Sequence, residues 1–198
     1  MLPNFAASLK VYWKSPINPM DQTLASVSEK SFNAYKKKNF LVANEGFREC
    51  LTLLEQQNDT LGAAEMRNNI SVVLLELEKP EEALAIVRGT DLVFAANGEK
   101  KRQAMALGNI AAALQALGKL TEALPIYEES AELFKETNDN ELRAITLKKI
   151  SDLQLRTGKQ YQALASLEAS YDQKEKKSLK EKILKDFLGT IIRKITRR

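Results

Sequence analysis

Four alanines recur at intervals of forty residues along the chain, namely Ala43, Ala83, Ala123 and Ala163. Each lies in a similar local sequence, and the four versions read KNFLVANEGF, KPEEALAIV, GKLTEALPIY and GKQYQALASL. Self-similarity at a fixed period of about 20–50 residues is typical of solenoids, in which one supersecondary unit stacks on the next. The period therefore predicts a stack of helical hairpins, an architecture that presents a surface to a partner more often than it carries out chemistry.

Further columns of similar residues align with the alanines. Apolar side chains follow four residues later, at Phe47, Val87, Tyr127 and Leu167. Small side chains lie three residues beyond these, at Cys50, Thr90, Ser130 and Ser170. A third column precedes the alanines, with Lys30, Ile70, Ile110 and Ile150 each followed by a small residue, at Ser31, Ser71, Ala111 and Ser151. Small residues beside apolar anchors let two helices approach closely, as antiparallel hairpins require.

These columns resemble the tetratricopeptide repeat (TPR) family over roughly residues 21 to 198. In the third copy the family pattern falls on Leu107, Ile110, Ala111, Leu114, Gly118, Ala123, Tyr127 and Ser130. The chain departs from that pattern because the tryptophan and the closing proline are missing and serine or alanine replaces the first glycine. The resemblance implies an all-α, right-handed superhelical solenoid. Its period exceeds the usual ~34 residues of the family, and we place the additional residues in a longer second helix and connecting loop.

Turn-forming residues divide the chain. Asparagine-containing pairs recur near one repeat position and predict turns between hairpins, at Asn58-Asp59, Asn97-Gly98 and Asn138-Asp139. Gly118 and Gly158 suit the position after a helix, and Pro80 suits the first turn of the next helix. We predict about nine helices of roughly 15–19 residues. They are divided into an N-terminal segment (residues 1–20, a short helix and proline-containing linker), four hairpins (21–178) and a basic amphipathic capping helix (179–198).

The composition argues against catalysis and cofactors. Histidine is absent, which removes the commonest general base and metal ligand. The single cysteine, Cys50, excludes a disulfide within the chain and falls in the small-residue column, so we interpret it as a packing residue. The eight glycines are scattered and form no phosphate-binding loop. We therefore predict a cytoplasmic protein that is not an enzyme and holds no cofactor or metal.

The C-terminal segment combines an apolar stripe with basic residues. The stripe has helical spacing, at Leu179, Ile183, Leu184, Phe187, Leu188, Ile191, Ile192 and Ile195. In one interpretation this helix caps the stack, with Phe187 and Ile191 in the register of a fifth repeat. In the other it binds an anionic membrane or nucleic acid. The two interpretations are compatible if the basic residues stay exposed beyond the cap, at Arg193, Lys194, Arg197 and Arg198.

The N-terminal segment has a short helical face formed by Phe5, Leu9, Tyr12 and Trp13, followed by the sequence SPINP, which breaks a helix. No apolar stretch suits a signal peptide or a membrane span. The segment is interpreted as a helix that docks on the first hairpin. A mobile arm, a partner-binding helix and a membrane-touching segment are the alternatives.

In this family the first helix of each hairpin lines a groove that binds peptides. The corresponding positions are Ser28, Phe32, Tyr35, Lys36, Asn68, Val72, Leu75, Glu76, Gly108, Ala112, Gln115, Lys148, Asp152 and Arg156. Such a groove suits a peptide with a hydrophobic anchor and an acidic group. The alternative is that its apolar members (Phe32, Tyr35, Val72 and Leu75) pack under the N-terminal segment.

The column Phe32, Val72, Ala112 and Asp152 lacks the asparagine that holds a chaperone C-terminus in this family, so that role is not expected. We expect Asn69 and Asn109 to bond the adjacent hairpin's backbone. The resemblance thus implies a non-catalytic scaffold or adaptor for a protein or peptide partner. Homodimerisation, and contact of the basic ends with a membrane or nucleic acid, are alternatives.

Overall fold

The computed structural model describes residues 19–173, 184–190 and 192. The helices are α1 (Pro19–Lys36), α2 (Phe40–Gln56), α3 (Thr60–Glu76), α4 (Pro80–Val87), α5 (Thr90–Ala96), α6 (Lys100–Ala116), α7 (Leu120–Glu136), α8 (Asn140–Arg156) and α9 (Gln160–Asp172). Residues 184–190 and 192 are also helical, and none of the described residues forms a strand. The prediction of an all-α chain is confirmed.

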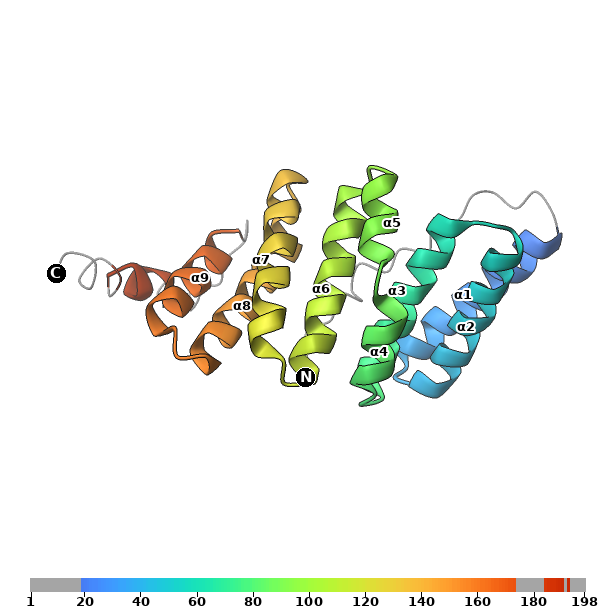
Figure 1. The fold of residues 1–198 in the computed structure, drawn as a ribbon, viewed down its shortest axis with the longest axis horizontal. Helices are drawn as coiled ribbons and strands as arrows, with labels where there is room; N and C mark the ends of the chain where they lie inside the picture. The colour runs from blue at the N-terminus through green and yellow to red at the C-terminus, as the bar shows by residue number, and fades with distance from the viewer. Residues whose placement is uncertain (1–18, 174–183, 191, 193–198) are drawn as a thin grey trace.

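The helices follow one another as a row of hairpins, with α1 at one end and α9 toward the other (Figure 1). The helices pack as hairpins, in which α1 pairs with α2, α3 with α4 and α5, α6 with α7, and α8 with α9. The predicted stack of hairpins is therefore confirmed in residues 19–173. One hydrophobic core cluster extends from α2 to α8 with side chains of α1 packed against it, and a smaller cluster lies around Phe94 of α5.

Every three-residue turn between consecutive helices has the same structure, repeated every twenty residues. One residue of each turn adopts a positive φ between 56° and 79°, at Lys38, Asn58, Glu78, Gly98, Gly118, Asn138 and Gly158. The amide of the next residue donates to a carbonyl five residues back, as in Asp59 N to Leu54 O at 2.9 Å. This is the Schellman arrangement, which satisfies carbonyl groups left free at a helix end.

The predicted longer connecting loop is wrong. The turns within and between hairpins have equal length, and most helices on either side of them have 17 residues. The additional residues of the forty-residue period therefore do not form a loop. They extend the helices of the repeat, because the same three-residue turn ends each one.

The second helix of the second hairpin is broken, which the sequence analysis did not predict. Arg88 is extended (ψ 133°) and Gly89 has a left-handed φ of 81°, so α4 ends at Val87 and α5 begins at Thr90. Glycine adopts this conformation without steric cost, whereas Glu49 and Glu129 occupy the same repeat position inside unbroken helices. Thr90 nevertheless stays buried, and its hydroxyl donates to the Val87 carbonyl at 2.8 Å.

The predicted alanine and small-residue columns form the closest contacts of the core. Ala43, Ala83, Ala123 and Ala163 are at most 1% exposed. The Ser130 hydroxyl donates to the Ala104 carbonyl of the preceding helix at 2.7 Å. These short side chains let the helix backbones approach while their hydroxyl groups remain bonded.

Cys50 is fully buried, which confirms its interpretation as a packing residue. Burial, reinforced by the negative charge of Glu49, raises the pKa of its thiol to about 12. Because the thiolate is the reactive form of cysteine, the side chain is chemically inert at neutral pH.

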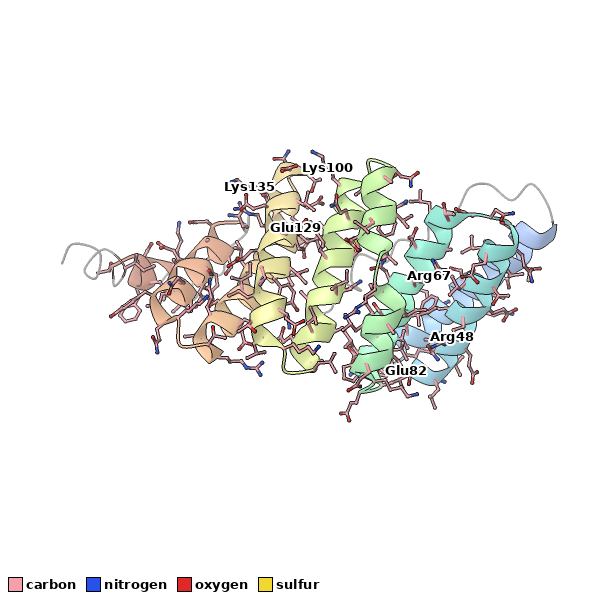
Figure 2. The ribbon with its side chains drawn as sticks, viewed as in Figure 1. Arg48, Arg67, Glu82, Lys100, Glu129 and Lys135 are labelled. Carbon is pink, nitrogen blue, oxygen red and sulfur yellow. The ribbon has the colours of Figure 1, made fainter. Side chains whose placement is uncertain are left out.

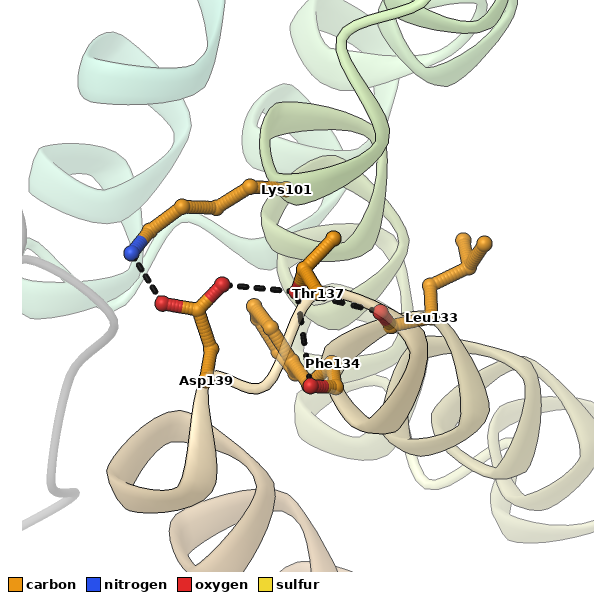
Figure 3. A network of polar contacts seen from close by, with 5 residues as sticks. All are labelled: Lys101, Leu133, Phe134, Thr137 and Asp139. Carbon is orange, nitrogen blue, oxygen red and sulfur yellow. Dashed lines mark hydrogen bonds and ion pairs between the residues drawn. The ribbon is translucent and has the colours of Figure 1, made fainter.

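A polar network fastens the turn between α7 and α8 to the start of α6 (Figure 3). The Thr137 hydroxyl lies 2.6 Å from Asp139 Oδ2 and 3.1 Å from the Leu133 carbonyl oxygen. The Lys101 ammonium group pairs with the other oxygen of the Asp139 carboxylate. The network thus fixes where α8 begins relative to the preceding hairpin.

Residues 184–190 contact the end of the stack, but not in the register of a fifth repeat. Leu188 is 4% exposed and Gly189 is buried, whereas Phe187, the predicted anchor, is 60% exposed. Lys185 Nζ pairs with Asp172 of α9 at 2.5 Å. The prediction for Phe187 is therefore wrong, because the buried side of this helix is centred one residue later. Ile191 lies outside the described residues.

Candidate protein-binding face

Hydrogen bonds and ion pairs join the first helices of consecutive hairpins directly. Asn109 Nδ2 of α6 donates to Asn68 Oδ1 of α3 at 3.0 Å. Gln115 Nε2 of α6 donates to Asp152 Oδ2 of α8 at 3.4 Å. Because these side chains occupy predicted groove positions or their neighbours, the first helices line up side by side. We call the surface formed by the predicted groove positions on α1, α3, α6 and α8 the first-helix face.

At the α1 end of this face, aromatic and basic groups pack on one another. Lys36 Nζ lies 4.3 Å from the centroid of the Phe32 ring, within the range of a cation–π contact. The Tyr35 ring lies 5.7 Å from the Phe40 ring in a tilted arrangement. Phe32 and Tyr35 are half-buried, so each presents only part of its ring at the surface.

The middle of the face is closed. Asn68 and Val72 of α3 are 8% and 4% exposed, and Gly108 of α6 is buried as well. These side chains are therefore not accessible in the structure, and their role as groove positions stays a prediction. Leu75 and Glu76 are half-buried at the end of α3.

Asn109 bonds differently from the prediction, through Asn68 of α3. Asn68 Nδ2 donates to the Ala64 carbonyl at 2.9 Å within its own helix. Its Oδ1 accepts from Asn109, so Asn109 bonds a side chain of the adjacent hairpin rather than its backbone. Both side chains are buried, and the pair satisfies polar groups that would otherwise lie unbonded between the helices.

At the α8 end, the face is open and charged. Asp152 and Arg156 are exposed and lie one helical turn apart, with Asp152 Oδ2 at 3.9 Å from Arg156 Nη1. Gln115 donates to Asp152 and accepts from the hydroxyl group of Tyr127 at 3.1 Å. Burial raises the pKa of that Tyr127 hydroxyl, so it stays protonated and able to donate.

Two lysines of α8 are drawn inward. Lys148 Nζ lies 5.2 Å from the centroid of the Tyr171 ring of α9, which directs this side chain toward its own hairpin partner. Burial lowers the pKa of Lys149, and the nearby Asp152 charge offsets part of that effect. Of the predicted positions on α8, Asp152 and Arg156 are therefore the ones most accessible to a partner.

One residue of this surface was not predicted from the sequence. Leu155 of α8 is 53% exposed and lies between Asp152 and Arg156. It occupies the same column as Tyr35, Leu75 and Gln115, at the forty-residue spacing. The register alone would have identified it, but the prediction followed the charged neighbours in copy four.

Outside the first-helix face, the stack carries a mixed set of charged side chains. Figure 2 shows them spread over several helices, and the labelled Arg48 of α2 and Glu82 of α4 lie 3.9 Å apart. Lys100 and Glu136 pair at 2.9 Å between α6 and α7. Exposed pairs of this kind contribute little to stability, typically about 0–1 kcal/mol. Their alternation of sign distinguishes this surface from a uniformly basic one.

Within the described residues, no three side chains of histidine, cysteine, aspartate or glutamate gather as metal ligands would. None of the helices in that part of the chain combines the length and the apolar character needed to cross a membrane. The basic residues predicted to reach beyond the cap (Arg193, Lys194, Arg197 and Arg198) and the N-terminal segment 1–18 lie outside the described residues.

The repeated hairpin and the common turn define an α-solenoid of the helical-repeat class. Residues 102–176 match the family model described as tetratricopeptide repeat. Over these residues the match confirms the resemblance to the tetratricopeptide repeat family that the sequence columns predicted. A search of curated proteins found no match.

Two crystal structures of nearly identical TPR-like repeats from a Podosopora anserina putative kinesin light chain share the fold. One aligns with a TM-score of 0.62 and 12% identity over 88% of this chain and 97% of that chain. The other aligns with a TM-score of 0.63 and 12% identity over 92% of this chain and 100% of that chain. Similarity at this level of identity concerns the fold alone, and it agrees with a right-handed superhelical stack.

Proposed function

We propose that the chain is a non-catalytic scaffold or adaptor, and that the α8 end of its first-helix face binds a peptide segment of a partner protein. Tetratricopeptide repeats generally mediate protein–protein interactions, which supports the class of function. The observation that carries the location is the exposed Leu155, an apolar side chain flanked by the exposed Asp152 and Arg156. Covering Leu155 would remove apolar area from water, and arginine is a side chain that interfaces favour as an anchor.

The chemistry of this site favours a peptide with a hydrophobic side chain and an acidic group. Leu155 offers the apolar contact. Arg156 has one long ion pair, at 3.9 Å, so most of its guanidinium donors are available to a carboxylate. Asp152 is held by Gln115 and Arg156, and it would reject a second acidic group on its own side. The two charges thereby fix the direction in which the peptide runs.

A peptide-display selection on the purified chain tests this proposal. Selected peptides should share a hydrophobic residue and a nearby acidic residue, and calorimetry on one of them gives the affinity. Leu155→Asp and Arg156→Ala should each weaken binding by about tenfold or more, since interface anchors cost more than ~1 kcal/mol when removed. Leu92→Asp is the matched control, because Leu92 of α5 is 68% exposed and lies outside the first-helix face.

Equal affinity for the Leu155→Asp variant and the intact chain would overturn the proposed site. A triple variant, Phe32→Ala, Tyr35→Ala and Arg156→Ala, separates the two ends of the face. If its affinity matches that of Arg156→Ala alone, the peptide contacts the α8 end and not the aromatic end. A further loss would extend the site to α1.

The cytoplasmic location and the oligomeric state are parts of the same proposal. We expect the chain in the cytosolic fraction of its cell, and we expect a monomer in sedimentation at micromolar concentration. A concentration-dependent mass would favour the homodimer. Binding of the intact chain to anionic vesicles or DNA, lost when residues 179–198 are deleted without loss of fold, would favour the membrane or nucleic-acid alternative.

A further inference from the structure

Helix α3 is enclosed on every side near its middle. Seven consecutive residues, from Asn68 to Leu74, are all buried. An α-helix completes a turn in about 3.6 residues, so seven buried residues in a row cover its whole circumference. Val72 is the most informative of them, because it lies about 200° around the helix from the core residue Ile70 and is only 4% exposed.

The described helices that pack extensively on α3 lie in the other layer or beside α3 in its own layer, so they do not show what covers its remaining side. Within the described residues, the helices with extensive contact to α3 are α2, α4, α5 and α6. Helix α6 lies beside α3 in the same layer, and α2, α4 and α5 belong to the other layer. A stack of two layers leaves the remaining side of each first helix open, as α8 illustrates with its exposed Asp152 and Leu155.

We propose that the chain's own N-terminal segment, residues 1–18, binds across α3 and α6 on the first-helix face. Its residues Phe5, Leu9, Tyr12 and Trp13 have the spacing of one helical face. That face matches the apolar strip of Val72, Leu75 and Ala112, which lies at successive positions of α3 and α6. Burial of apolar area between them would supply the affinity.

The charge and the length of residues 1–18 agree with their binding across α3 and α6. The segment contains Lys10 and Lys14 and no acidic residue. The predicted groove positions of α3 and α6, in contrast, include the acidic Glu76 and no basic residue. Residues 5–14 would form a helix about 15 Å long, and residues 15–18 add about 13 Å of extended chain. Neighbouring helices lie about 8–10 Å apart, and Val72 lies about 20 Å further along α3 than the level of Pro19, so the Phe5 end of the segment can reach this strip.

Docking of residues 1–18 stands without the proposed function, and only its consequence for peptide binding at Leu155 rests on that function. An N-terminal segment on α3 and α6 occupies the centre of the first-helix face and leaves Leu155 free at the α8 end. The partner's peptide would then lie next to the segment. Deletion of residues 1–18 would expose more of the first-helix face. Docking itself is measured without any partner, so the two proposals fail separately.

Trp13 provides a direct measurement, because it is the one tryptophan of the sequence. Its fluorescence in the intact chain should be blue-shifted and protected from acrylamide, relative to a synthetic peptide of residues 1–18. Leu75→Glu and Ala112→Glu, both at half-buried positions, should abolish the shift while circular dichroism remains helical. Leu92→Glu on α5 should leave the shift unchanged, as the matched exposed control.

Three outcomes of the fluorescence measurement would contradict the proposal. A shift abolished by Val42→Glu on α2, but kept in Leu75→Glu and Ala112→Glu, would place the segment on the first hairpin and overturn the proposal. Emission identical to that of the free peptide would overturn it too, because the segment would then be mobile. A shift that grows with protein concentration would mean that a second copy supplies the segment, which also contradicts docking within one chain.

Cross-linking gives a second measurement that does not depend on charge-introducing variants. The native Cys50 is buried and its thiol has a pKa of about 12, so it leaves the background unreactive. A short bismaleimide should join Leu9→Cys to Ala112→Cys within one chain. It should not join Leu9→Cys to Ala95→Cys, which is exposed on α5. Equal yields from the two pairs, or a cross-linked dimer alone, would contradict the proposal.

Discussion

Gly46 of α2 and Ser31 of α1 pack so closely that a Cβ atom added at Gly46 would lie 2.0 Å from the Ser31 hydroxyl oxygen. That hydroxyl donates to the Val27 carbonyl at 2.6 Å. We expect Gly46→Ala to displace it and to lower the free energy of unfolding by about 1–2 kcal/mol, despite the gain of ~1 kcal/mol in helix propensity.

Denaturant unfolding of a double-mutant cycle measures this contact. In a Ser31→Ala background the obstructing oxygen is gone, and Gly46→Ala should be nearly neutral. The same loss in both backgrounds would show that the crowding at Gly46 comes from another neighbour.

Glu78 and Lys38 occupy the left-handed position of their turns, where three other turns have glycine. A side chain in this conformation costs roughly 1–2 kcal/mol that glycine avoids. We expect Glu78→Gly to raise the free energy of unfolding by about 0.5–1 kcal/mol. Glu128→Gly, at an exposed position inside α7, should lower it by about 1 kcal/mol in the same thermal unfolding assay. Destabilisation by both substitutions would contradict the turn assignment.

Lys149 gives a pH dependence of defined sign. Burial lowers its pKa in the folded chain below the ordinary value of 10.5. Between these two values the unfolded chain binds more protons, so stability rises with pH across that window. Lys149→Met should therefore raise the melting temperature at pH 7, where the buried charge opposes folding. The gain should shrink as the pH passes 10.5, and a gain that grows there would contradict the assignment.

Leu188 and Phe187 form a matched pair that tests the packing of the C-terminal helix. Leu188 is 4% exposed and Phe187 is 60% exposed. Leu188→Ala should destabilise the chain by about 2 kcal/mol, because it removes buried apolar volume, and Phe187→Ala should change stability by less than ~0.5 kcal/mol. A larger loss of stability for Phe187→Ala than for Leu188→Ala, measured by denaturant unfolding, would support the fifth-repeat register predicted from the sequence.

The sequence was sufficient to predict the hairpins because their determinants are local and repeated. Ala123 and Ser130 pack where the period places them, and Asn58 and Gly118 adopt the left-handed turn conformation that their side chains allow. The break at Gly89 was not predicted, since one glycine inside a helical pattern is often tolerated. Its left-handed φ became evident only in the structure.

The candidate site was harder to predict because exposure depends on what covers a face. Val72 and Leu155 lie in neighbouring columns of the same face, yet Val72 is 4% exposed and Leu155 is 53% exposed. Periodicity assigns both residues to the first-helix face, but it contains no information about a covering segment. The prediction for Phe187 failed for a related reason. The helix that contains Phe187 packs on one side only, so its rotation is not fixed by two neighbours.

Backbone chemical shifts of the intact chain, measured by NMR, test the repeated hairpin most directly. The account predicts helical Cα shifts from residue 40 to residue 172, interrupted at each left-handed turn and once more at Arg88 and Gly89. Strand-like shifts within that range, or helical shifts that continue through Asn58, Gly98 and Asn138, would contradict it.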